Sequence, residues 1–142
     1  MSTNNAPRIA VVGSLNMDLV LQVQHAPGPG ETVLADALHL VPGGKGGNQA
    51  VACARQGAQV ALFGRVGDDG YGYTLRAGLD ADGIDHSGVQ TDTETTTGVA
   101  AITVEATGQN RIVVVPSANG RFVLDAAALG AALQGAAGLV LQ

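Results

Sequence analysis

Charged side chains are scarce in this sequence. They make up 13% of its 142 residues, about half of the ~25% that is typical of soluble domains. The seven Lys and Arg residues are scattered, and the formal net charge is −5. Nucleic acids and anionic membrane surfaces both bind clustered Lys and Arg, so neither is expected as the main partner. So little charge also predicts that part of the surface is covered by a partner or by further chain.

Cysteine and long apolar runs are scarce as well. The single cysteine, Cys53, cannot form an internal disulfide, and the three histidines do not give it a metal-binding spacing. We interpret Cys53 as a small buried residue on a helix. The polar N-terminal segment MSTNNAPR is not expected to be a signal peptide or an anchor. The apolar stretch 126–141 is rich in Ala and Gly and shorter than the ~20 residues that span a bilayer. We therefore expect a cytoplasmic protein.

Apolar residues and glycine are plentiful. The hydrophobic fraction is 46%, the mean hydropathy is +0.22 and there are 21 glycines. This composition excludes a disordered chain. A chain of this length is expected to form one domain and to bury about two-thirds of its unfolded surface.

Buried strands and helices are predicted to alternate along much of the chain. Short apolar runs predict buried strands at 8–14, 59–67 and 139–141. Helical spacing and caps predict helices at 47–57, 71–83 and from Asp125 to Leu133. This order is typical of an α/β protein with a parallel sheet flanked by helices.

A second group of segments has a different pattern. These segments alternate apolar and polar residues, at about 18–26, 32–41, 97–105 and 111–116. The last two are separated by Ala-Thr-Gly-Gln-Asn, which is a strong hairpin signal. We expect them to form a separate small antiparallel sheet. The predicted core therefore comprises about 8–15, 43–95 and 120–142, and the predicted lid comprises about 18–41 and 97–116.

The stretch PGGKGGNQA (42–50) concentrates glycine, lysine and asparagine before a predicted helix. It is not a Walker A phosphate loop, because His39 and Gly46 occupy positions that require Gly and Ser or Thr. The Rossmann glycine fingerprint is also absent after the first strand. The backbone N–H groups at a helix start can bind a hydroxyl or an anionic oxygen. Lys45 and Asn48 are three residues apart and project from one side, which suits a neutral polyol as well as an anion.

A second polar pair, Asn16 and Asp18, follows the first buried strand. The two residues are two apart in extended chain, so both side chains point the same way. Ligands of open α/β sheets lie outside the carboxyl ends of the strands, where this pair is expected. An Asn/Asp turn is the simpler interpretation of the pair alone. Two converging polar pairs nevertheless favour a site for a ligand that carries hydroxyl groups.

The sequence resembles the ribokinase family of sugar kinases, also called the PfkB carbohydrate kinases. The family's first signature is matched by Gly43, Gly44, Lys45, Gly46, Asn48 and Ala50, with Gly57 and Gly67 at the expected spacing. The blocks that resemble the ribokinase branch are GSLNMD, PGET, GGKGGNQAVA, VGDDGYG and TGVAAITV. The resemblance extends from about residue 8 to the end of the chain.

The resemblance implies an α/β sandwich core with a small β lid that also serves as the surface of a homodimer. It implies ATP-dependent phosphorylation of D-ribose to ribose 5-phosphate, with Mg2+ and a stimulating K+. The residues carried over as ribose-binding by their place in the motifs are Asn16, Asp18, Gly43, Gly44, Lys45 and Asn48.

Two departures from the family pattern affect these expectations. Ser117 stands where the family commonly has glycine before Ala-Asn. The chain is also about half as long as these kinases, and the catalytic aspartate, the anion hole and the nucleotide and potassium sites all belong to the other half. No catalytic and no metal-binding residue is therefore assigned here. We expect the chain to be the N-terminal part of such a kinase, and to be inactive alone because it lacks a base and phosphoryl donors.

Two alternatives stay open. Another kinase of the family, acting on deoxyribose, fructose or a nucleoside such as adenosine, would carry similar motifs. A short sugar-binding or oligomerising protein without catalysis is the alternative from a different class. The low charge and the apolar final strand, which leaves an open sheet edge, argue against a stable short monomer.

Overall fold

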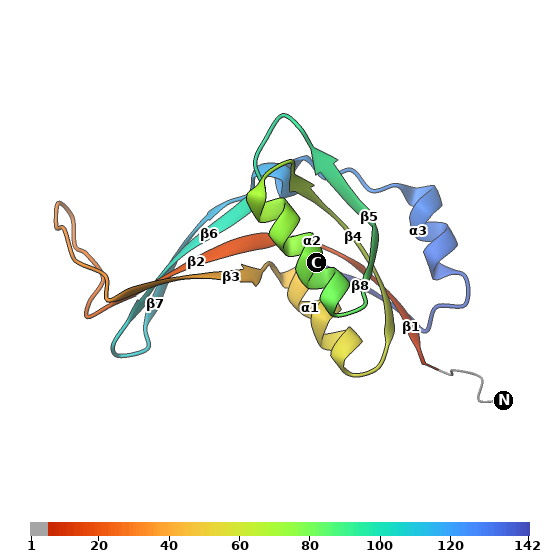
Figure 1. The fold of residues 1–142 in the computed structure, drawn as a ribbon, viewed down its shortest axis with the longest axis horizontal. Coiled ribbons are helices and arrows are strands. Elements are labelled where there is room, and N and C mark those ends of the chain that lie inside the picture. Colours follow the sequence, from red (N-terminus) through yellow and green to blue (C-terminus); the bar gives the residue numbers. More distant parts are fainter. Residues whose placement is uncertain (1–5) are drawn as a thin grey trace.

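The structure of the protein is a computed structural model that describes residues 6–142. Two four-stranded sheets form its framework (Figure 1). The core sheet has the strand order β5-β4-β1-β8 and is parallel throughout. Its strands are β1 (Arg8–Val12), β4 (Gln59–Gly67), β5 (Asp85–Asp92) and β8 (Gly138–Leu141). The helices are α1 (Lys45–Arg55), α2 (Gly70–Ala81) and α3 (Ala126–Leu133). This confirms the predicted parallel α/β core.

Helices cover both faces of the central strands of the core sheet, whereas the edge strand β8 stays largely exposed. Successive residues of a strand point to opposite faces, so Val11 packs with the cluster beneath α1 and α2. Ala10 and Val12 point the other way and pack with Leu129 of α3. The two central strands therefore lack a polar face, and their continuous apolar sequences follow from this.

The lid sheet has the strand order β3-β2-β6-β7 and projects from the core (Figure 1). Its strands are β2 (Asn16–Val23), β3 (Ala37–Gly43), β6 (Gly98–Glu105) and β7 (Asn110–Val115). The pairs β2–β3 and β6–β7 are antiparallel, as predicted, but the central pair β2–β6 is parallel. The reason is the chain path: β6 returns to β2 only after α1, β4, α2 and β5, so no hairpin joins this pair.

Three local features differ from the sequence-based expectations. Strand β5, DHSGVQTD, was not predicted, because this edge strand is mostly polar and does not alternate. Strand β3 begins at Ala37, so the first part of the predicted segment 32–41 is not a strand. A short 3-10 helix, η1 (Ser117–Arg121), was not predicted either. Ser117 has a φ of 45°, in the left-handed region that favours glycine, which explains the glycine that the family commonly has there.

The start of α1 lies directly against the loop that joins β1 to β2. A Cβ added at Gly44 would be 2.6 Å from the Ser14 carbonyl oxygen, and one added at Gly46 would be 2.6 Å from the Gly13 Cα. The N–H of Gly47 donates to the Ser14 carbonyl at 3.0 Å. Gly44 also has a φ of 86°. The glycines of the stretch 42–50 therefore let two backbone segments touch, which side chains would prevent.

This contact predicts opposite effects for the same substitution at two helical glycines. Gly46→Ala should destabilise the protein by more than about 2 kcal/mol, because its Cβ would overlap backbone that cannot rotate away. Gly78→Ala, in α2, has nothing within 4 Å of the new Cβ, and should stabilise by about 0.5–1 kcal/mol. Urea unfolding of both variants measures the difference. Equal effects at the two sites would contradict the close contact.

Candidate functional site

Asn16 and Asp18 lie on one face of the lid sheet, where β2 leaves the core. Asn16 is paired with Gly43 on one side and with Gly98 on the other, and Asp18 is paired with Val41 and Ala100. Both side chains are half-buried. Three of these four neighbours are glycine or alanine, which leave the two polar side chains little covered from the flanking strands. The structure thus places the pair on one face, as predicted.

The Asp18 carboxylate leans over the backbone of Gly43. A Cβ added at Gly43 would be 2.7 Å from Asp18 Oδ1, so glycine is required for this arrangement. Within residues 6–142, no group donates a hydrogen bond to the carboxylate, and burial raises the pKa of Asp18 above its ordinary value. A half-buried acceptor without a donor carries a cost that a ligand hydroxyl would relieve.

Lys45 and Asn48 lie in the first turn of α1, and both are exposed. In the part of the chain described, Lys45 forms no ion pair with Asp18, so the ammonium does not neutralise that carboxylate. The structure therefore groups Asn16, Asp18, Gly43 and Gly44 by direct backbone or side-chain proximity. Lys45 and Asn48 join them only through the turn at Gly44.

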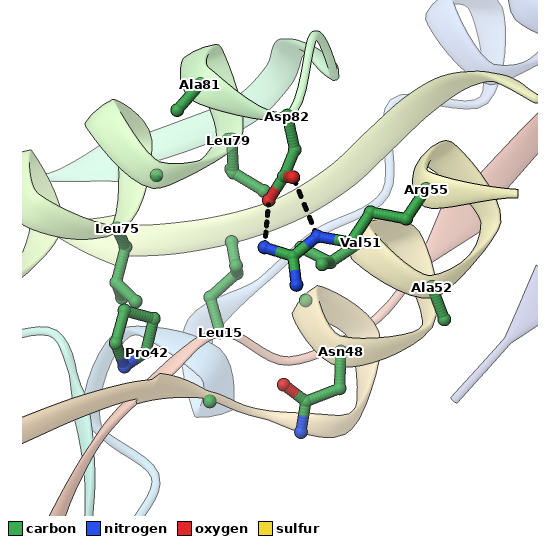
Figure 2. Close-up of a pocket in the computed structure, with 13 residues that line it drawn as sticks. Leu15, Pro42, Asn48, Val51, Ala52, Arg55, Leu75, Leu79, Ala81 and Asp82 are labelled. Atoms are coloured by element: carbon green, nitrogen blue, oxygen red, sulfur yellow. Dashed lines mark hydrogen bonds and ion pairs between the residues drawn. The ribbon is translucent and has the colours of Figure 1, made fainter. Parts of the chain in front are cut away.

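A hollow of the surface lies beside these residues, between α1 and α2 (Figure 2). Its volume is about 570 Å³, and its walls are mostly apolar. Arg55 and Asp82 close one end through two hydrogen bonds of 2.8 and 3.0 Å. Of the six predicted site residues, only Gly43 and Asn48 line this hollow. Because its charged groups already satisfy each other, we do not assign it to a polar ligand.

Asp69 links the core to the lid and was not recognised as important from the sequence. It is the N-cap of α2 and accepts from Gly72 N at 2.8 Å, Thr97 N at 2.7 Å and Thr97 Oγ1 at 2.7 Å. Burial acts to raise the pKa of Asp69, but the hydrogen bonds from Thr97 and Gly72 outweigh it and hold the pKa below its ordinary value. The signal was present in VGDDGYG, where Asp precedes the helix start.

Asp92 is another acid that sequence reasoning missed, and unlike Asp69 it is fully buried. It is 1% exposed, and its Oδ2 accepts from Arg65 Nε at 2.9 Å and faces Arg121 Nε at 3.1 Å. The hydrogen bond from the Glu94 N–H lowers the pKa of Asp92, and the guanidinium groups of Arg121 and Arg65 lower it further. Burial acts in the opposite direction, but the pKa stays below its ordinary value. This network fastens η1 to the ends of β4 and β5. Because its charges are mutually paired, it has a structural role.

The start of α1 does not have the open backbone of a phosphate-binding loop. The backbone at Gly44 and Gly46 is packed on residues 13–15, so it cannot also wrap around a phosphate. Within residues 6–142, no three His, Cys, Asp or Glu side chains converge as metal ligands. No helix among the described residues is long and apolar enough to span a membrane.

Residues 6–140 match the pfkB family of carbohydrate kinases. The chain belongs to this family.

The chain is similar to curated ribokinases and deoxyribokinases and to solved ribokinase structures. The chain is 50% identical to the ribokinase of Bacillus subtilis over 91 residues, which is 63% of this chain and 31% of that protein. It is 39% identical to the deoxyribokinase of Salmonella typhi over 82 residues, which is 58% of this chain and 27% of that protein. Among solved structures, Arabidopsis thaliana ribokinase complexed with ribose and ATP superposes with a TM-score of 0.83. That match has 31% identity and covers 96% of this chain and 45% of the other.

The chain thus spans less than half the length of each of these relatives. The match to the solved structure includes both sheets, because it covers nearly the whole chain. This confirms the predicted fold class, a ribokinase-like core with a second, mostly antiparallel sheet.

The cap at Asp69 predicts a pH-dependent loss of stability. A carboxyl group whose pKa is lowered by folding stabilises the protein above the unfolded value of about 3.9, and the benefit disappears as pH falls through the folded pKa. Asp69→Ala should cost about 1–3 kcal/mol at pH 7. The difference from wild type should shrink as the pH is lowered from 5 towards 3 in urea unfolding. Asp68→Ala, at the exposed neighbour, is the control and should change little. A difference that stays constant with pH would contradict this assignment.

Proposed function

We propose that this chain carries the sugar-binding part of an enzyme that phosphorylates D-ribose to D-ribose 5-phosphate with ATP. The observation that carries the proposal is the half-buried Asp18 carboxylate, which no described residue satisfies and whose pKa burial raises. It stands beside Asn16 and Gly43 at the carboxyl end of β1, where open α/β folds bind ligands. The similarity to ribokinases, one of them solved with ribose and ATP, supports the same conclusion.

The proposed site distinguishes sugars by their hydroxyl groups. Ionised Asp18 can only accept hydrogen bonds, whereas Asn16 and Asn48 offer amide donors and acceptors and Lys45 offers a cation. Such a set favours a furanose with adjacent free hydroxyls at positions 2 and 3. Phosphorylation of 2-deoxyribose is the second candidate, because a deoxyribokinase is 39% identical to the chain over 82 residues.

ATP, Mg2+ and K+ belong in this proposal to the whole enzyme, and no residue of this chain is assigned to them. Phosphoryl transfer needs a group to accept the sugar's proton and donors for the transferred phosphoryl. The contribution of this chain is to bind the sugar and fix its orientation, which is a large part of what positions a reacting hydroxyl. We propose that the chain alone has no kinase activity.

A sugar panel tests the substrate. Isothermal titration of the chain should give the tightest binding for D-ribose, with 2-deoxy-D-ribose weaker by about tenfold because one hydrogen-bonded hydroxyl is lost. D-Fructose and adenosine should bind more weakly still. Tighter binding of 2-deoxyribose, fructose or adenosine would replace ribose in the proposal.

Asp18→Asn tests the residue that carries the proposal. We expect ribose binding to be lost, because the acceptor-only group is replaced by an amide. We expect the melting temperature without sugar to stay level or rise, because a charge with a burial-raised pKa destabilises the fold above that pKa and the amide removes this cost. Asp36→Asn, on an exposed lid carboxylate that accepts from Gln24, is the matched control. Unchanged ribose binding in Asp18→Asn would refute the site.

We propose further that the lid forms a homodimer through the face opposite Asp18. On that face Leu40, Leu19, Ala101 and Val113 form one cross-strand row. The ends of the row are open: Leu40 is 53% exposed and Val113 is 67% exposed. Exposed apolar side chains in such a row are typical of an interaction surface.

The dimer is testable by analytical ultracentrifugation. Val113→Asp should convert the dimer to a monomer, because it places a charge on the proposed apolar contact. Val123→Asp, which is equally exposed but lies outside the lid, should leave the assembly unchanged. A wild-type chain that sediments as a monomer at all concentrations would exclude this dimer.

A further inference from the structure

Asn119 of η1 reaches into the base of the lid and binds the residue pair Leu15–Asn16. Its Oδ1 accepts from the Leu15 N–H at 2.9 Å, and its Nδ2 donates to the Leu15 carbonyl at 3.0 Å. The same Nδ2 donates to Asn16 Oδ1 at 2.8 Å. One side chain thus holds both backbone groups of Leu15 and one end of the Asn16 amide.

This geometry determines which way both amides point. The Leu15 N–H is only a donor and the Leu15 carbonyl only an acceptor, so the oxygen and nitrogen of Asn119 cannot be exchanged without losing both bonds. Since Asn119 Nδ2 is a donor, its partner on Asn16 must be the oxygen. The Asn16 Nδ2 is therefore the end that remains for a ligand. The orientation follows from backbone chemistry and not from an arbitrary choice of amide rotamer.

We propose that Asn119 is a positioning residue that makes Asn16 present a hydrogen-bond donor beside the acceptor Asp18. The inference rests on the proposed sugar-binding function. It adds how the site determines which of its groups donates and which accepts a hydrogen bond. A hydroxyl at this place can donate its one hydrogen to Asp18 and accept from Asn16. If the Asn16 amide were reversed, both protein groups would be acceptors and one hydrogen bond would be lost.

Two neighbouring residues are adapted to this contact. A Cβ at Gly98 would be 2.5 Å from Asn16 Oδ1 and would also overlap Asn119 Nδ2, so the bond between the two amides requires glycine there. Ser117 adopts its left-handed φ of 45° at the start of η1, and the adjoining Ala118 is fully buried. A strained residue is retained where the surrounding structure specifies it, and here it directs the chain towards Asn119.

The experiment is Asn119→Asp studied by NMR in the 15N-labelled chain. The carboxylate keeps the bond from the Leu15 N–H but can no longer donate, so the Asn16 amide should turn and donate to it. In wild type, the Nδ2 protons of Asn119 should exchange slowly with solvent and those of Asn16 quickly. In Asn119→Asp, the Asn16 protons should become protected. D-Ribose, titrated by chemical-shift changes, should bind about tenfold more weakly.

A double-mutant cycle separates positioning from a general structural effect. Asn119→Asp should weaken ribose binding in the wild-type background and have little further effect in an Asn16→Ala background. Gln90→Leu is the control, because it removes a different hydrogen bond to the chain just after η1. In that bond Gln90 Nε2 donates to the Val123 carbonyl at 2.6 Å. This variant should leave ribose binding unchanged.

The outcomes are distinguishable. Protected Asn16 Nδ2 protons in wild type would overturn the proposed orientation, and this measurement needs no variant. An equal loss of binding in both backgrounds would overturn the positioning role and leave the sugar site intact. A wild-type chain with the predicted exchange pattern that binds no ribose would refute the proposed function and, with it, the role of Asn119 in sugar binding.

Discussion

The placing of the candidate site residues depends on the contact between the start of α1 and the loop after β1. Backbone meets backbone there because Gly44 and Gly46 have no side chains. The contact brings the turn at Gly43 to the base of β2, and it is the reason that Asn16, Asp18 and the first turn of α1 share one region. The glycines of PGGKGGNQA therefore contact another part of the same chain, and the polar side chains of this stretch remain available for a ligand.

The core was predictable because its sequence signals are strong and local. Buried strands such as the one in RIAVVGS are continuous apolar runs. Helix α3 begins directly after Asp125, which caps it by accepting from Ala127 N and Ala128 N. The polar edge strand β5 gave no such signal, since a strand at the margin of a sheet need not alternate. The parallel pairing of β2 with β6 was also missed, because register between distant strands is decided by packing and not by local pattern.

In the candidate site, too, local sequence patterns predict some residues and give no signal for others. Asn16 and Asp18 are predicted as site residues from their spacing after a buried strand, and Lys45 and Asn48 from their spacing at a helix start. Asp69, Asp92 and Asn119 were not identified, because their roles arise from partners far away in the sequence, such as Thr97, Arg121 and Leu15. Long-range hydrogen bonds of a single polar residue have no periodicity by which a sequence could reveal them.

The parallel pair β2–β6 has a consequence for the order of folding. Asn16 meets Gly98 and Val23 meets Glu105, and the chain between the two strands contains α1, β4, α2 and β5. Closing so long a loop costs entropy that only an already compact core can reduce. We therefore expect the lid to fold late, with its ligand face completed only after the core is in place. On this expectation, a nascent chain contains Asp18 early in synthesis, but the candidate site around it forms only after β6 has paired with β2.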